Sequence, residues 1–136
     1  SRSAGPATRL NLDEYIDTTE NGIKHFSKVP KTKAILNLNP ADPCIDMQTT
    51  IFAQVENPDM DSLLYEVDIM VKKIQEYVPG YSLLVPPIFE NGRIVIMVKA
   101  QGLGDYLPKY AGNLDIINCA AISVAEQYSK NFNNIK

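Results

Sequence analysis

A chain of 136 residues, of which 45% are hydrophobic and 21% charged, has the size and composition of one globular domain with a core. The net charge of −3 and the dispersed lysines and arginines exclude a nucleic acid or an anionic membrane surface as a partner held through phosphate contacts. No apolar run is long enough to cross a bilayer, and two cysteines allow at most one disulfide and no metal cluster, so we expect a cytoplasmic protein with reduced thiols.

The first ten residues are predicted to be a loop, because Gly5-Pro6 interrupts them. The chain starts at Ser1 with neither a methionine nor a signal peptide, so we expect further sequence upstream. Asn11 is a suitable N-cap for a helix, and Glu14 can complete a capping box with it. Apolar side chains then recur on one helical face until Lys28-Val29-Pro30, where we expect the helix to end.

Two strands and a helix are predicted over the next fifty residues. Residues 33–38 are apolar enough for a short, largely buried strand, and the two prolines within 39–43 then exclude regular structure. Residues 48–55 form a second strand with apolar residues on one face. The clearest element is a helix from Met60 to Tyr77, with apolar residues at helical spacing, and Asn57-Pro58-Asp59 supplies its start.

A β-hairpin should follow this helix. Tyr81–Phe89 is extended, but Pro86-Pro87 cannot donate ladder hydrogen bonds, which favours an edge strand or a bulge. Asn91-Gly92 is a strong turn signal, and Arg93–Lys99 alternates as the returning strand. After a loop, residues 114–132 have the apolar spacing of a final helix.

The order of these elements predicts the fold class: α+β, with two layers in which helices cover one face of a mixed or antiparallel sheet. We expect residues 1–136 to form a single domain. Apolar residues point to both faces of Arg93–Lys99, so the second face of the sheet should meet another chain or a missing domain. The alternative is a small sheet with helices on both sides.

The residue types that usually perform catalysis are few and scattered. His25, the single histidine, lies near the end of the first predicted helix, where a solvated side chain is expected. Cys44 and Cys119 lack a neighbouring histidine or basic cluster that would activate a thiol. Gly102-Leu103-Gly104 lacks the third glycine of a dinucleotide fingerprint. We therefore predict no nucleophile, metal site or dinucleotide motif within this chain.

Two loops have an unusual composition. The first, Ser3–Asn11, combines small residues, hydroxyls and an arginine before a helix N-terminus, whose N–H groups can bind an anion or a carboxamide oxygen. The second, Asp105–Asp115, is polar and aromatic and leads into the last helix. Each has a simpler interpretation: an ordinary helix start for the first, and helix capping by Asn113 for the second.

Four blocks of sequence together resemble one enzyme family. The blocks are Ser3–Glu14, Asn39-Pro40-Ala41-Asp42-Pro43, Tyr77-Val78-Pro79-Gly80-Tyr81 and Tyr106-Leu107-Pro108-Lys109-Tyr110-Ala111-Gly112-Asn113-Leu114-Asp115-Ile116. The last block is long and chemically unusual, and the four occur in the family's order over nearly the whole chain. In these segments the chain resembles the acylating acetaldehyde dehydrogenases.

The resemblance implies the C-terminal dimerisation and substrate domain of such an enzyme, with a fold like the C-terminal domain of glyceraldehyde-3-phosphate dehydrogenase. Family members convert acetaldehyde, NAD and coenzyme A into acetyl-CoA and NADH. Their nucleophilic cysteine and phosphate-binding glycines belong to an upstream nucleotide-binding domain, which we expect outside this chain. The isolated chain is therefore expected to be inactive.

The same resemblance implies cofactor contacts and partners. The family's NAD-contacting residues match Ser3, Ala4, Gly5, Pro6, Ala7, Thr8, Arg9, Leu10, Asn11 and Asn113. Their implied role is to hold the nicotinamide side of NAD so that one face meets the reacting group. The implied partners are a second copy of the chain, paired through the sheet, the upstream domain, and a 4-hydroxy-2-oxoacid aldolase that delivers acetaldehyde.

Departures from the family pattern leave part of the mechanism open. Gln48 and Thr49 stand where better-known members carry an arginine and an aspartate proposed as a general base, and a threonine hydroxyl cannot accept a proton as a carboxylate does. The connection over 81–93 is shorter than usual, and Ala7 replaces a common glycine. Two alternatives remain: a module that only dimerises, and an ACT-like ligand-sensing domain, which would leave residues 111–113 unexplained.

Overall fold

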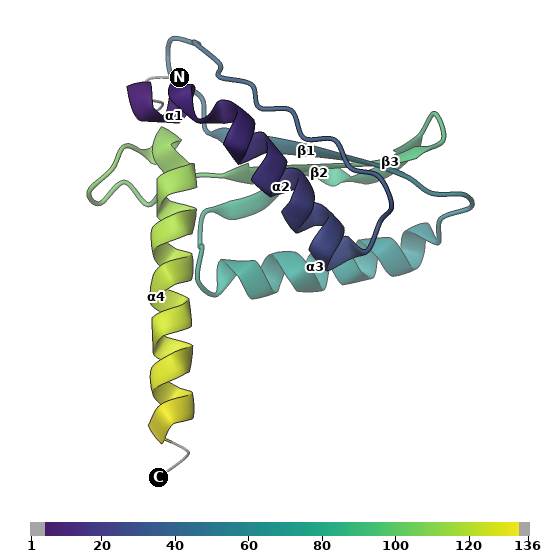
Figure 1. Cartoon of the computed structure of the whole chain (residues 1–136). Helices are drawn as coiled ribbons and strands as arrows, with labels where there is room; N and C mark the ends of the chain where they lie inside the picture. The colour runs from purple at the N-terminus through teal and green to yellow at the C-terminus, as the bar shows by residue number, and fades with distance from the viewer. Residues whose placement is uncertain (1–4, 134–136) are drawn as a thin grey trace. The chain divides into compact units, whose positions relative to one another are not determined.

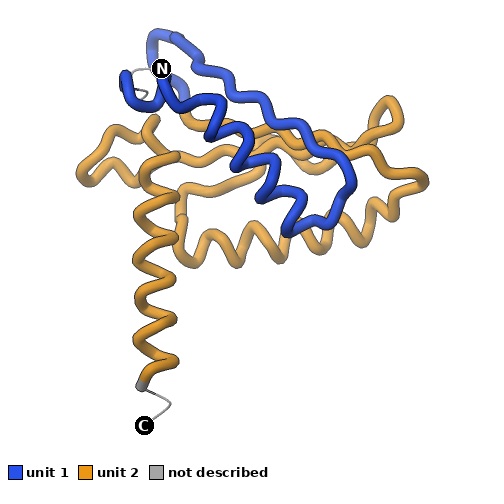
Figure 2. Tube along the Cα trace, viewed as in Figure 1, with its two compact units in different colours: residues 1–45 blue, residues 46–136 orange. Residues whose placement is uncertain are grey.

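The computed structural model describes residues 5–133, which fall into two compact units. Unit 1 ends at Ile45 and unit 2 begins at Asp46 (Figure 2). Each unit has its own secondary structure: unit 1 holds two helices and an irregular segment, and unit 2 holds a sheet with its helices. No helix among the described residues is long and apolar enough to span a membrane.

Unit 1 starts with two consecutive helices (Figure 1). α1 spans Pro6–Leu10 and α2 spans Leu12–Ser27. The prediction of a loop over the first ten residues is therefore wrong for Pro6–Leu10, because proline at the first helical position has its φ already set for a helix. α2 ends where predicted, at Lys28, whose φ of 60° lies in the left-handed region.

Asn11 joins the two helices differently from the prediction. Its side chain was expected to cap α2, but no side chain caps that helix. Instead the Asn11 Nδ2 donates to the carbonyl of Ala7 at 2.9 Å, and the Asn11 backbone N–H donates to the carbonyl of Thr8 at 3.3 Å. The Asn11 side chain therefore closes α1, whose last carbonyl groups need donors, while the Asn11 carbonyl accepts the first hydrogen bond of α2 from the Tyr15 N–H at 3.1 Å.

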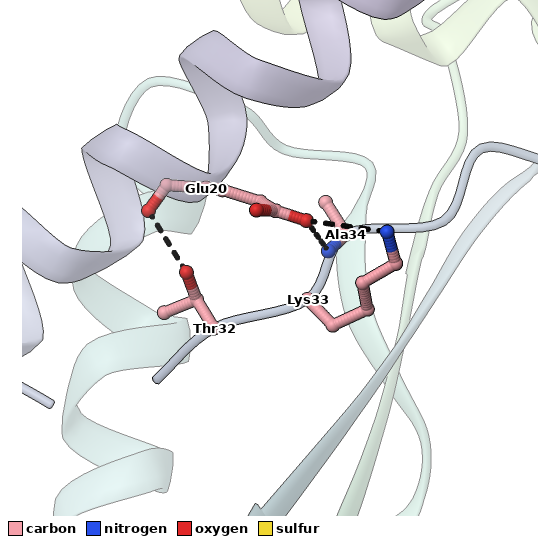
Figure 3. A network of polar contacts seen from close by, with 4 residues as sticks. All are labelled: Glu20, Thr32, Lys33 and Ala34. Atoms are coloured by element: carbon pink, nitrogen blue, oxygen red, sulfur yellow. Dashed lines mark hydrogen bonds and ion pairs between the residues drawn. The ribbon is translucent and has the colours of Figure 1, made fainter. Parts of the chain in front are cut away.

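The prediction of a buried strand over residues 33–38 is wrong, because the segment pairs with no other strand. Its polar contacts go to Glu20 in α2 instead (Figure 3). The Thr32 hydroxyl donates to the Glu20 carbonyl at 3.3 Å, and the Ala34 N–H donates to the Glu20 carboxylate at 2.9 Å. The side chain of Ile35, which suggested burial, is 84% exposed.

Unit 2 is built on a three-stranded antiparallel sheet (Figure 1). β1 spans Met47–Gln54, β2 spans Tyr81–Glu90 and β3 spans Arg93–Ala100, in the order β1-β3-β2. β1 and β2 both run antiparallel to β3, so they are parallel to each other, and α3, Met60–Gln75, connects them. The α+β class is confirmed, with β3 in the centre and one strand fewer than predicted.

β2 is an edge strand with irregular pairing, as its prolines predict. Its register against β3 shifts between Leu83 and Val85 and again between Val85 and Ile88, on either side of Pro86-Pro87. The predicted turn at Asn91-Gly92 is confirmed, with φ angles of 52° and 75°. Two consecutive positive φ angles are what a two-residue type I′ hairpin turn requires.

α3 has a side-chain cap and packs against β2. Its N-cap is Asp59, whose carboxylate accepts from the Ser62 hydroxyl at 2.7 Å and from the Ser62 N–H at 3.0 Å. These two hydrogen bonds hold the pKa of Asp59 below its ordinary value. At the other end, the Gln75 side chain donates to the carbonyl of Tyr81 at 2.7 Å. The most buried apolar residues are Val78, Ile94, Val98, Ala100 and Ala111.

Candidate functional site

The predicted cofactor-contacting residues fall in both units, and each group is described within its own unit. Ser3 and Ala4 lie outside the described residues. Residues 5–11 belong to unit 1, whereas Asn113 belongs to unit 2. That both groups contact one cofactor stays a prediction.

The unit 1 group is coiled into α1 and is fully solvent-facing, with every residue from Gly5 to Asn11 exposed. The Asn11 Nδ2 is committed to the carbonyl of Ala7, but its Oδ1 accepts no hydrogen bond among the described residues. The Thr8 hydroxyl is likewise unpaired within that part of the chain. A hydroxyl and an amide oxygen on an exposed surface suit hydroxyl-bearing ligands, because they complement both donors and acceptors.

In unit 2, the end of β3 is held between two glycines. A Cβ at Gly80 would lie 1.8 Å from the Gln101 carbonyl oxygen, and a Cβ at Gly112 would lie 2.1 Å from the Ala100 carbonyl oxygen. The Gln101 N–H also donates to the Gly80 carbonyl at 3.0 Å. Only glycine permits both approaches, so the first turn of the following helix is fixed against the end of the strand.

That helix, α4, spans Gly112–Asn133 and follows a short 3₁₀ turn, η1, at Lys109–Ala111. The alternative interpretation, that Asn113 only caps the helix, is wrong, because the helix begins at Gly112 and Asn113 lies inside its first turn. The half-buried Asn113 carboxamide makes no hydrogen bond with the described residues. It therefore keeps its two donors and its acceptor for a ligand such as another carboxamide.

The loop between β3 and α4 is fastened by two backbone donors. The Gly102 N–H donates to the carbonyl of Lys109 at 2.7 Å, and the Leu103 N–H donates to the Asp115 carboxylate at 2.7 Å. The sequence pattern did not predict this contact of Asp115. The loop and α4 line an open hollow of about 380 Å³, formed by Leu103, Asp105, Tyr106, Leu107, Asp115, Asn118 and Cys119.

Thr49 departs from the family pattern, and no acidic residue of β1 lies on the same face of the strand. Thr49 pairs with Val98 in the β1–β3 ladder. Asp46 precedes it by three residues, so its side chain projects to the opposite face of the sheet. There the Asp46 carboxylate accepts from Gln101 Nε2 at 3.2 Å and lies 3.8 Å from Lys99 Nζ. Asp46 therefore does not take the position of a base at Thr49.

The other residues singled out for their chemistry belong to different elements. Cys44 is in unit 1 and Cys119 in unit 2, and both are free thiols of intermediate exposure. His25 lies in the last turn of α2, edge-on to Phe26 with ring centroids 5.2 Å apart. No group of three His, Cys, Asp or Glu side chains in residues 5–133 could hold a metal ion.

One face of the sheet carries an apolar band that crosses all three strands. Its members are paired directly in the ladder, Phe52 with Val95, Ile88 with Val95, and Val85 with Met97, so their side chains share a face. Phe52, Ile88 and Val85 are 61%, 45% and 41% exposed. We call the five residues Phe52, Val85, Ile88, Val95 and Met97 the open face. Its exposure in a single chain is typical of an interaction surface.

Comparison with known proteins gives consistent results. The family described as prokaryotic acetaldehyde dehydrogenase, dimerisation, matches residues 1–108. An acetaldehyde dehydrogenase of Spirochaeta aurantia is 62% identical over 130 residues, which are 96% of this chain and 44% of the relative. Those of Pectobacterium atrosepticum and Carboxydothermus hydrogenoformans are 60% and 48% identical over 95% and 96% of this chain, again 44% of each relative. The chain thus spans less than half the length of these relatives.

Proposed function

The chain belongs to the dimerisation family of prokaryotic acetaldehyde dehydrogenases, and we propose that it is the C-terminal part of a cytoplasmic enzyme that converts acetaldehyde, NAD and coenzyme A into acetyl-CoA and NADH. In that enzyme it supplies a dimerisation surface and contacts to the nicotinamide side of NAD. The observation that carries the cofactor role is the carboxamide of Asn113, which makes no hydrogen bond within residues 5–133 and which Gly112 fixes at the end of β3.

The available groups fit NAD chemically. NAD supplies the hydride acceptor for the oxidation, and coenzyme A accepts the acyl group. The Asn113 carboxamide can donate to and accept from the nicotinamide carboxamide, and the Thr8 hydroxyl and Asn11 Oδ1 can bond to ribose hydroxyls. In this proposal the three side chains bind NAD and orient its nicotinamide ring. The nucleophilic cysteine belongs upstream in this proposal, so the 136-residue chain alone forms no NADH from acetaldehyde.

The cofactor role is tested in the full-length enzyme by Asn113→Ala. Loss of a hydrogen bond to the cofactor should lower kcat/KM for NAD about tenfold, mainly through KM, and should weaken NAD binding in calorimetry to the same extent. Asn131→Ala is the matched control, because Asn131 is an exposed asparagine near the other end of α4. Near-normal kinetics of Asn113→Ala would remove Asn113 from the site.

We propose that the open face pairs with the open face of a second copy. A two-fold contact of this kind is self-complementary, and burying a band of five apolar residues removes the exposure that a single chain shows. Phe52→Asp should therefore convert dimers of the full-length enzyme into monomers in light scattering. Tyr65→Asp is the control, because Tyr65 is 66% exposed on α3. Dimers that survive Phe52→Asp would place the interface elsewhere.

We also propose two other partners, the upstream nucleotide-binding domain and an aldolase. α4 carries a row of exposed apolar residues at helical spacing, Ile117, Val124 and Tyr128, which are 63%, 67% and 70% exposed. We assign this row to the upstream nucleotide-binding domain, which would cover it. Val124→Asp should then lower the melting temperature of the full-length enzyme while leaving its dimers intact.

A 4-hydroxy-2-oxoacid aldolase is the proposed protein partner, and co-purification of the two enzymes tests this proposal.

A further inference from the structure

We propose that Asp115 is a positioning residue: its carboxylate fastens the loop of residues 101–111 to the first turn of α4 and thereby sets the orientation of Asn113. The inference rests on the proposed role of Asn113 in binding NAD. It assigns to Asp115 a role that acts through Asn113.

The contact between Asp115 and the loop is close and specific. The Leu103 N–H donates to Asp115 Oδ2 at 2.7 Å, a short distance typical of a charge-assisted hydrogen bond. Gly102 lies against the same oxygen, and a Cβ there would be 2.7 Å from it. A side chain at residue 102 would therefore crowd the carboxylate at the point where it reaches the loop backbone.

Asn113 lies between two fixed points of the helix start. On one side, Gly112 packs against the Ala100 carbonyl, where a Cβ would be 2.1 Å from the oxygen. On the other side, Asp115 holds Leu103. Because the Asn113 side chain has no hydrogen bond of its own among the described residues, its direction is set by the backbone of this turn. Loss of the second fixed point should let the turn rotate about the first.

The loop has backbone closures that do not involve Asp115, so we expect the fold to tolerate replacement of this residue. The Gly102 N–H donates to the Lys109 carbonyl at 2.7 Å, and the Ala111 N–H donates to the Pro108 carbonyl at 2.8 Å. These backbone bonds remain when Asp115 is replaced. The expected consequence is a misplaced Asn113 in a folded, dimeric enzyme.

The experiment uses the full-length enzyme in a double-mutant cycle. Asp115→Ala should lower kcat/KM for NAD about tenfold, through KM more than kcat, with unchanged melting temperature and dimer mass. Asp115→Asn should restore most of the loss, because an amide oxygen still accepts from the Leu103 N–H. In an Asn113→Ala background, Asp115→Ala should add less than about twofold, since it acts through the missing side chain. Asp105→Ala, in the same loop and exposed, is the control.

The outcomes separate this inference from the proposed function. Normal kinetics of Asp115→Ala beside an impaired Asn113→Ala would overturn the inference alone, as would additive losses in the cycle or an Asp115→Asn that behaves like alanine. Normal kinetics of Asn113→Ala would overturn both. Should Asp115→Ala fail to fold, Gly102→Ala decides, because its Cβ displaces the carboxylate: a raised KM for NAD supports the inference, and an unchanged KM overturns it.

Discussion

Replacing Gly80 with alanine should loosen the end of β3. The new Cβ would lie 1.8 Å from the Gln101 carbonyl oxygen, whereas Cβ atoms in proteins essentially never come within 3.0 Å of a heavy atom. The backbone at Gln101 would have to retreat by about 1.2 Å to reach that limit. The obstacle is backbone, so rotation of a side chain cannot relieve it.

The cost follows from the contacts at this point. Overpacking of this kind costs about 1–3 kcal/mol. The retreat also breaks the hydrogen bond from the Gln101 N–H to the Gly80 carbonyl, which contributes about 1 kcal/mol net. Reduced freedom of alanine in the unfolded chain offsets about 0.4–1 kcal/mol. The free energy of unfolding should therefore fall by about 1–3.6 kcal/mol, centred on about 2.3 kcal/mol, a large share of the roughly 5–15 kcal/mol typical of a domain.

Urea denaturation followed by far-ultraviolet circular dichroism measures this loss, since the chain has no tryptophan to report on unfolding. The unfolding midpoint should fall by about 1–2 M for a slope of about 1.5–2 kcal/mol/M. Gly22→Ala is the matched control: nothing lies within 4 Å of its Cβ, and alanine in α2 should stabilise by about 0.5–1 kcal/mol. A Gly80→Ala protein with the parental midpoint would refute the steric argument.

Three other substitutions probe local structure. Asp59→Ala should lower the urea midpoint, because it removes the acceptor for the Ser62 N–H. Since folding depresses the pKa of Asp59, the stabilisation by its carboxylate is present above the ordinary pKa of 3.8 and is lost as the pH falls through the lower pKa of the folded protein. The urea midpoints of the two proteins should therefore converge in acid. Glu20→Ala should speed hydrogen exchange of the Ala34 amide about tenfold, and Glu20→Gln should retain most of the protection. Gly92→Ala should cost about 1–2 kcal/mol in urea unfolding, because its φ of 75° is left-handed.

Elements with strong local chemistry were predictable from the sequence. The turn at Asn91-Gly92, the edge position of β2 with Pro86-Pro87, and the long apolar spacing of α3 all follow from neighbouring residues alone. Residues 33–38 were wrongly predicted to be a strand. The acceptor for the Ala34 N–H is the carboxylate of Glu20, which lies fourteen residues earlier in α2. A propensity argument weighs residues near each other in sequence and cannot see that contact.

The candidate site divides in the same way. Asn113 is predicted to contact the cofactor only through a long block of sequence that resembles a family, whereas local physics favoured a helix cap, and the cofactor contact stays a prediction. The helix begins one residue earlier, at Gly112, which excludes the cap. The close approach of Gly112 to the Ala100 carbonyl is not marked by any pattern in the sequence. The bond from the Leu103 N–H to Asp115 joins residues twelve positions apart, a spacing that matches neither a helical nor a strand period.

The central place of β3 has a consequence for synthesis of the chain on the ribosome. In the described residues β1 pairs with β3 alone, although β3 is the last strand to be made. Translation adds about 5–20 residues per second, so β1, with the apolar Ile51 and Phe52, waits several seconds for its partner. During that interval it is an unpaired, aggregation-prone edge, and any nascent chain that stalls before Arg93 leaves it so.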